Sequence, residues 1–212
     1  MKKEFTTKPS IITETWPGEL SMFAWQEFVA SIPAPLFVAT SYKANGKPNA
    51  CLQSWAGFAS DSGQFTCILG WVNIHGHFYK TLKETGCCVL NFPSGELVDK
   101  CYDTIEHNQY DADEITASGM TVEKAAHVNA PRIAECFLNI ECELLWEKQN
   151  FQGSDNVVVA LKAVHFGMDS NRYDHSKLGR HGETGYVMYT SELINPETGK
   201  REQVKYGTIQ PH

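Results

Sequence analysis

Short runs of apolar residues, separated by turn-forming residues, dominate the chain, and most of them have the length of a β-strand. Residues 137–146 (FLNIECELLW) alternate apolar and polar positions, which is typical of a strand with one buried face. The other predicted strands span 35–42, 49–59, 64–71, 87–92, 156–166 and, as a short last strand, 185–189. The pattern therefore predicts a mainly β protein.

Tight turns connect neighbouring predicted strands. Asn45-Gly46 separates the first two strands and is the strongest short hairpin signal in the chain. Asp61-Ser62-Gly63 and a turn around Gly153 connect two further pairs. Strands joined by tight turns run antiparallel, and strands do not alternate with long helices along the chain. We therefore predict an antiparallel barrel with flanking helices rather than a doubly wound parallel sheet.

Helical spacing of apolar residues is confined to the segments 19–30, 77–84 and 96–105. Gly86 follows the second of these segments and is expected to end that helix as a C-terminal cap. The predicted organisation is an N-terminal extension with a short helix at 1–31, a barrel domain at 32–170, and a tail at 171–212 that packs on the barrel or on a partner subunit.

Composition narrows the possible partners. The chain has 212 residues and a net charge of -7, which argues against nonspecific binding to nucleic acid or to an anionic membrane surface. No apolar run approaches the roughly 20 residues of a transmembrane helix, and the basic start is not followed by a secretion signal. The seven cysteines are odd in number and include the adjacent pair Cys87-Cys88, so we predict reduced thiols and a cytoplasmic protein.

The segment 70–94 carries groups suited to a metal, a thiol reaction or an anionic cofactor. His75 and His77 do not have the spacing of a structural zinc site, so no metal site is predicted. Cys87 and Cys88 point to opposite faces of a strand, and we interpret at least one as a core residue; a catalytic Cys/His pair stays an alternative. Because the chain has no Gly-rich phosphate loop, a cofactor phosphate would meet side chains such as His77 and Lys83.

A second cluster lies in residues 48–63. Small residues around Ser54 allow the backbone to approach a flat ring, and Gln53 supplies a polar contact. Trp55 and Trp71 supply planar faces, although aromatic residues fill cores more often than they form sites.

Seven segments in order resemble one family: NGKPNA (45–50), SW (54–55), the Asp61 turn, LKETG (82–86), VLNFPS (89–94), APRIAE (130–135) and NIEC (139–142). Together they cover about residues 35–169 and resemble the flavin reductase-like, FMN-binding split-barrel family, in particular its flavoredoxin-type members. The resemblance implies a six-stranded antiparallel Greek-key split barrel with flanking helices, usually a homodimer with FMN near the dimer interface.

The same resemblance implies which residues hold the flavin. The candidate FMN-binding residues are Asn49, Cys51, Leu52, Gln53, Ser54, Trp55, Trp71, His77, Tyr79 and Lys83. Lys83 matches the cation that faces the phosphate in relatives, and Asn91 matches a scaffold asparagine. Many relatives carry an Arg-x-Thr or Tyr-Thr pair at the start of the helix, where this chain has His77-Phe78-Tyr79. The threonine hydroxyl is missing, so the phosphate anchor departs from the family pattern.

The resemblance implies an FMN-dependent oxidoreductase of flavoredoxin type. It would pass electrons from NAD(P)H or an iron–sulfur partner through bound FMN to a second acceptor, and no catalytic acid or base is required of the protein. The alternatives are a nonenzymatic FMN carrier or sensor with the same fold, and a binding module that has lost its flavin.

Overall fold

A computed structural model describes residues 2–12, 25–173, 185–190, 195, 197–200 and 205–209. The chain divides into two compact units, Met1–Ala34 with Met188–Gly207, and Pro35–Val187 with Thr208–His212. The first unit contains helix α1 (Trp25–Ala30) and most of a three-stranded sheet of order β1-β11-β12. These strands are β1 (Ala34–Pro35), β11 (Val187–Thr190) and β12 (Lys205–Thr208).

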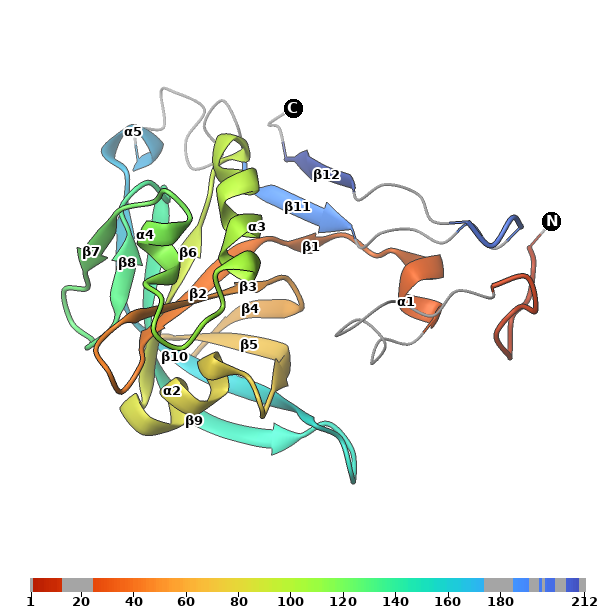
Figure 1. Cartoon of the computed structure of the whole chain (residues 1–212), viewed down its shortest axis with the longest axis horizontal. Coiled ribbons are helices and arrows are strands. Elements are labelled where there is room, and N and C mark those ends of the chain that lie inside the picture. Colours follow the sequence, from red (N-terminus) through yellow and green to blue (C-terminus); the bar gives the residue numbers. More distant parts are fainter. Residues whose placement is uncertain are drawn as a thin grey trace. The chain divides into compact units, whose positions relative to one another are not determined.

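The second unit is built on a seven-stranded antiparallel sheet of order β3-β2-β6-β9-β10-β5-β4 (Figure 1). Its strands are β2 (Phe37–Tyr42), β3 (Pro48–Gln53), β4 (Ala56–Asp61), β5 (Gln64–Asn73), β6 (Cys87–Phe92), β9 (Leu138–Gln149) and β10 (Asn156–Met168). Each predicted strand within 35–166 is present, and the predicted mainly β, antiparallel architecture is confirmed.

The two edge strands of this sheet, β3 and β4, are consecutive in sequence and are linked only by Ser54 and Trp55. The sheet must therefore curl until its edges meet at this corner. Side chains complete the closure, because the rings of Phe37 on β2 and Phe58 on β4 lie 5.9 Å apart and Cys51 packs against the same core. The result is a barrel that is split between β3 and β4.

The strand count differs from the expected six because the predicted strand 49–59 is two strands. The chain leaves one edge of the sheet at Ser54 and joins the other at Ala56. The carbonyl of Trp55 accepts a hydrogen bond from the Gly70 N–H at 2.7 Å, which fixes the corner onto β5. A Cβ at Gly70 would lie 3.3 Å from that same carbonyl oxygen, so a glycine suits this close approach.

The barrel interior is apolar, and Cys88 is part of it. Cys87 packs on the opposite side of β6, in a separate cluster with Val89 and Ala130. The expectation that the two thiols point to opposite faces, with at least one of them a core residue, is confirmed.

Helices cover the barrel on two sides (Figure 1). Helix α2 (His77–Thr85) packs on β2, where the hydroxyls of Ser41 and Thr81 hydrogen-bond, and it ends at Gly86 with φ 70° as predicted. Helices α3 (Val98–Glu106), after the short 3-10 turn η2 (Gly95–Leu97), and α4 (Glu114–Ala117) cover the outer face of β2 and β3. The remaining elements are β7 (Val122–Lys124), β8 (Pro131–Ile133) and α5 (Ser170–Tyr173).

Some predictions fall partly outside the described residues. Helix α1 covers 25–30 of the predicted helix 19–30, and the preceding residues of that helix are not among those described. The predicted boundaries at 32 and 170 stay predictions. No helix among the described residues has both the length and the apolar character needed to cross a membrane.

Candidate functional site

Strand β3 presents Asn49, Cys51 and Gln53 on one face, since side chains two residues apart on a strand share a face. Asn49 and Gln53 are buried, with exposed fractions of 2% and 7%. The Gln53 Nε2 group donates to the Cys51 sulfur at 3.2 Å. Within the described structure, Asn49 Nδ2 and Gln53 Oε1 have no hydrogen-bond partner. Buried polar atoms are nearly always paired, so this face offers one donor and one acceptor to a ligand.

The backbone of β3 also offers donors, because β3 is an edge strand. The Ala50 N–H donates to Glu114 Oε2 at 2.7 Å, so it points away from β2. Alternation along an antiparallel ladder directs the Leu52 N–H toward the same free edge. The Leu52 side chain itself packs outward, against the cluster under α3 and α4, which leaves only its backbone for a ligand.

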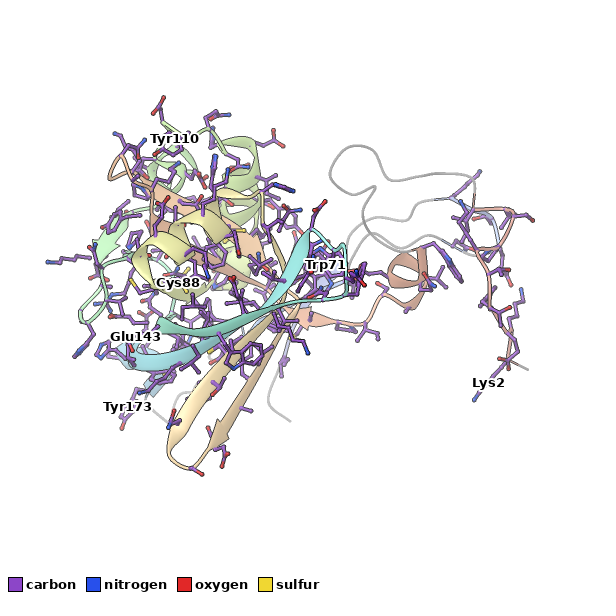
Figure 2. The ribbon with its side chains drawn as sticks, turned by 90° about the horizontal axis from the view of Figure 1, so that it is seen from below. Lys2, Trp71, Cys88, Tyr110, Glu143 and Tyr173 are labelled. Atoms are coloured by element: carbon purple, nitrogen blue, oxygen red, sulfur yellow. The ribbon has the colours of Figure 1, made fainter. Side chains whose placement is uncertain are left out.

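The β3–β4 corner brings the two candidate tryptophans to neighbouring strands. Ser54 is buried, Trp55 and Trp71 are half-buried, and the Trp55–Gly70 hydrogen bond lies between them. The Asn150 Nδ2 group donates to the Gly70 carbonyl at 3.3 Å, so the β9–β10 hairpin reaches the same corner. Figure 2 shows Trp71 beside this hairpin.

His77 begins α2 and faces α4. Its Nδ1 atom lies 3.9 Å from Glu114 Oε1, and its ring meets the Tyr110 ring edge-on at 5.9 Å. Glu114 is buried and already binds Lys43 Nζ at 2.9 Å. The N-cap residue Gly76 makes no side-chain hydrogen bond to the first turn of α2, and uncapped N–H groups at a helix start are suited to an anion.

Lys83 and Tyr79 face β9 instead. The Lys83 Nζ and the Tyr79 hydroxyl both donate to Glu147 Oε1, each at 3.0 Å. The bond to Glu147 raises the pKa of Lys83, and burial together with the same carboxylate raises the pKa of Tyr79. The structure therefore separates the expected phosphate ligands, with His77 on the α4 side of α2 and Lys83 on the β9 side.

Sequence reasoning missed Glu114 and Asn150. Glu114 lies in an acidic, polar segment that looks solvated, yet its side chain is buried and its carboxylate binds β3. The partner Lys43 is also fully buried, and its Nζ donates to the carbonyls of Gln109 and Ala112 as well. No local pattern signals this pair, because the partners are far apart in sequence.

The geometry does not support the hypotheses of a metal site at His75 and His77 or of a catalytic thiol at Cys87 or Cys88. His75 lies 3.5 Å from Asp155 at the surface, whereas His77 faces Glu114. Among the residues described, no three His, Cys, Asp or Glu side chains gather as a metal site would require. Burial raises the pKa of the Cys88 thiol well above its usual value, which keeps that thiol protonated.

Comparisons with known proteins bear on this geometry. The "Uncharacterized protein" of Methanothermobacter thermautotrophicus is 30% identical over 95 residues, which span 44% of this chain and 44% of that relative. Flavoredoxin of Desulfovibrio vulgaris (Miyazaki F) superposes with a TM-score of 0.62 at 20% identity, over 74% of this chain and 82% of its own.

Two further solved structures share the fold over most of the chain. The FMN-binding protein from Thermus thermophilus gives a TM-score of 0.66 at 15% identity, over 99% of this chain and 97% of its own. Nitrilotriacetate monooxygenase component B from Bacillus cereus gives 0.71 at 14% identity, over 87% and 88%. At these identities the likeness shows the fold, which confirms the predicted split-barrel class. The sequence model of the flavin reductase like domain matches residues 29–190, and the chain therefore belongs to that family.

Proposed function

We propose that the protein binds FMN along β3 and the start of α2 and acts as a flavin-dependent oxidoreductase of flavoredoxin type. The observation that carries the proposal is the pair of buried, unpartnered amide atoms on one face of β3, Asn49 Nδ2 and Gln53 Oε1. Their chemistry fits the isoalloxazine ring, whose pyrimidine edge carries carbonyl acceptors and one N–H donor. The Leu52 N–H at the free edge of β3 adds a second donor to the same strand.

In this proposal the phosphate of FMN lies at the first turn of α2. The uncapped N–H groups of this turn and the His77 ring supply donors, and an anion is stabilised at a helix N-terminus. Lys83 stays our predicted phosphate ligand. To bind the phosphate, its Nζ must leave its ion pair with Glu147. Lys80, an exposed lysine one turn after His77, is the alternative cation on this helix.

The bound flavin would supply the electron transfer itself. The residues of this chain hold and orient the ring. The buried Ser54 and the half-buried tryptophans of the corner exclude water from it. No side chain is required to move a proton. We further propose that NAD(P)H or an iron–sulfur protein is the electron donor. The protein would act as a homodimer in the cytoplasm.

The first experiment is an equilibrium titration of the flavin-free chain with FMN and with riboflavin, followed by its visible absorbance. FMN should bind, and riboflavin should bind more weakly because it lacks the phosphate. A charge-assisted contact is worth about ten-fold in affinity or more, so Lys83→Ala should weaken FMN by that factor and leave riboflavin unchanged. Lys80→Ala is the matched control on the same helix.

The outcomes separate the parts of the proposal. If neither flavin binds, the FMN site on β3 is wrong. If Lys80→Ala loses FMN affinity and Lys83→Ala does not, Lys80 rather than Lys83 faces the phosphate. Steady-state oxidation of NADH or NADPH by the FMN-loaded protein distinguishes an enzyme from a carrier or sensor, which would show no turnover.

A further inference from the structure

The seven cysteines of the chain differ in exposure. All of them lie within residues 25–173, none forms a disulfide, and six are buried. Cys51 on β3 is half-buried. Burial raises the pKa of the Cys88 thiol well above its usual value and raises the pKa of Cys101 to about 12. Buried thiols are shielded from dissolved reagents, so Cys51 is the thiol that such a reagent can reach first.

A neighbouring side chain on β3 contacts the Cys51 sulfur. Gln53 lies two residues further along the same face of β3, and its Nε2 donates to the Cys51 sulfur at 3.2 Å. A hydrogen bond donated to sulfur stabilises the thiolate over the thiol, and the thiolate is the nucleophile in disulfide chemistry. The contact therefore holds the sulfur in one orientation and places a donor beside it for the thiolate, while the thiol itself donates weakly to the Leu52 carbonyl at 3.9 Å.

The same glutamine points to the kind of molecule that reacts there. Its Oε1 is buried and has no hydrogen-bond partner among the described residues. On the other side of Cys51, the Asn49 Nδ2 group is buried and likewise has no hydrogen-bond partner in the part of the chain that the structure describes. A peptide-like molecule carries one N–H and one carbonyl for each amide, so its amide groups can satisfy both atoms while a sulfur of the same molecule meets Cys51.

We propose that Cys51 is a site of thiol–disulfide exchange with small peptide-like disulfides, such as glutathione disulfide. We further propose that the mixed disulfide blocks flavin binding along β3, a step that rests on the proposed function. The Cys51 thiol first loses its proton to solvent. Its thiolate then attacks one sulfur of the reagent, a new S–S bond forms, and the second sulfur leaves as a thiolate with the electrons of the broken bond. An added thiol reverses the exchange.

The first test counts accessible thiols in the folded, flavin-free chain with dithionitrobenzoate, an aromatic disulfide. One equivalent of thionitrobenzoate per chain should be released, and none from Cys51→Ser. Cys87→Ser, which removes a buried thiol, should still release one equivalent. Gln53→Leu should slow the reaction by roughly three-fold or more, the rate loss expected for one hydrogen bond. Release of more than one equivalent, or of one from Cys51→Ser, overturns the proposal.

The second test uses glutathione disulfide and intact-mass spectrometry with peptide mapping. The glutathione adduct should map to Cys51 in the wild-type chain, a result that does not depend on whether Cys51→Ser folds. Saturating FMN should suppress the adduct, and the modified chain should lose FMN binding until it is reduced. An adduct that forms equally fast with FMN bound overturns the blocking step. If FMN does not bind at all, the proposed function fails, while the thiol count on the flavin-free chain still decides the reactivity of Cys51.

Discussion

At the scale of single residues, hydrogen-bond pairing distinguishes buried polar side chains with a structural role from those available to bind a ligand. Asn91 is fully paired, because its amide donates to the Val38 carbonyl and Thr40 hydroxyl and its oxygen accepts from Ile133 N and Asn139 Nδ2. Such full pairing is what a scaffold residue requires, and this stays its predicted role. By contrast, Asn49 Nδ2 and Gln53 Oε1 on β3 have no hydrogen-bond partner among the described residues. We therefore assign these two atoms a role in ligand binding.

Trp55 and Trp71 provide a prediction about the flavin ring. A tryptophan close to a flavin quenches its emission by electron transfer. We therefore expect Trp55→Phe or Trp71→Phe to change the fluorescence yield or the dissociation constant of bound FMN. Trp25→Phe is the control, because Trp25 lies on α1 and its ring packs edge-on against Phe5. If Trp55→Phe and Trp71→Phe both behave like that control, the ring does not lie at the β3–β4 corner.

Glu141 provides a prediction about stability. Its buried carboxylate accepts hydrogen bonds from the N–H groups of Ala126, His127 and Val128 at 2.8, 2.7 and 3.1 Å. Burial raises the pKa of Glu141, but these three donors and the nearby Arg132 outweigh it and hold the pKa below its ordinary value. The stabilisation is therefore present above the pKa of the unfolded chain and is lost as the pH falls through the lower pKa of the folded chain.

Urea unfolding across the acid range tests this. Glu141→Ala should lower the free energy of unfolding at neutral pH by about 3 kcal/mol, since several charge-assisted hydrogen bonds are lost. The loss should shrink as the pH falls and the wild-type carboxyl becomes protonated. Glu143→Ala, an exposed residue of the same strand, should have little effect at any pH. A Glu141→Ala effect that does not change with pH would show that the charge is unimportant.

At the scale of elements, the capping glycine of α2 can be tested directly. Gly86 adopts φ 70° and ψ 7°, and its N–H donates to the Leu82 carbonyl. A side chain in this left-handed conformation costs about 1–2 kcal/mol, so Gly86→Ala should lower the free energy of unfolding by that amount. Gly57→Ala, in β4 with open space around its Cα, should be close to neutral. Thermal or urea unfolding of the two variants gives the comparison.

The turns and the α2 cap could be predicted from sequence because they follow local rules. Gly46 has φ 79°, and Ser62 and Gly63 have φ 50° and 78°, which are the positive values that these hairpin turns require. The break at Ser54–Trp55 could not be predicted, because 49–59 is one continuous strand-like run and the choice of partner strand is set by long-range pairing.

The separation of His77 from Lys83 could have been predicted from the sequence. The six residues from His77 to Lys83 rotate a helix by about 240° beyond one full turn, which already places them on different sides of α2.

At the scale of the whole molecule, exposed apolar side chains on the β9–β10 hairpin support the predicted homodimer. Leu145, Trp146 and Phe151 are 47%, 50% and 64% exposed. Light scattering of the purified chain should give about twice its mass of 23.7 kDa. If the hairpin carries the interface, Phe151→Ser should yield monomers and weaken FMN, whereas Ile105→Ser, an exposed apolar residue of α3, should remain dimeric. A monomer that holds FMN tightly would contradict a shared site.

The strand order has a consequence for the kinetics of folding. Three pairs, β2–β3, β4–β5 and β9–β10, are hairpins that close short loops, but β5 pairs with β10 through contacts such as Asn73 with Asn156. Closing that long loop costs chain entropy before the pairing repays it, so the protein should fold on the millisecond-to-second scale of non-local β proteins. In pulsed hydrogen exchange during refolding, amides of the hairpins should gain protection first. Amides that bridge β5 and β10 should follow later, when the β4–β5 hairpin joins the rest of the sheet.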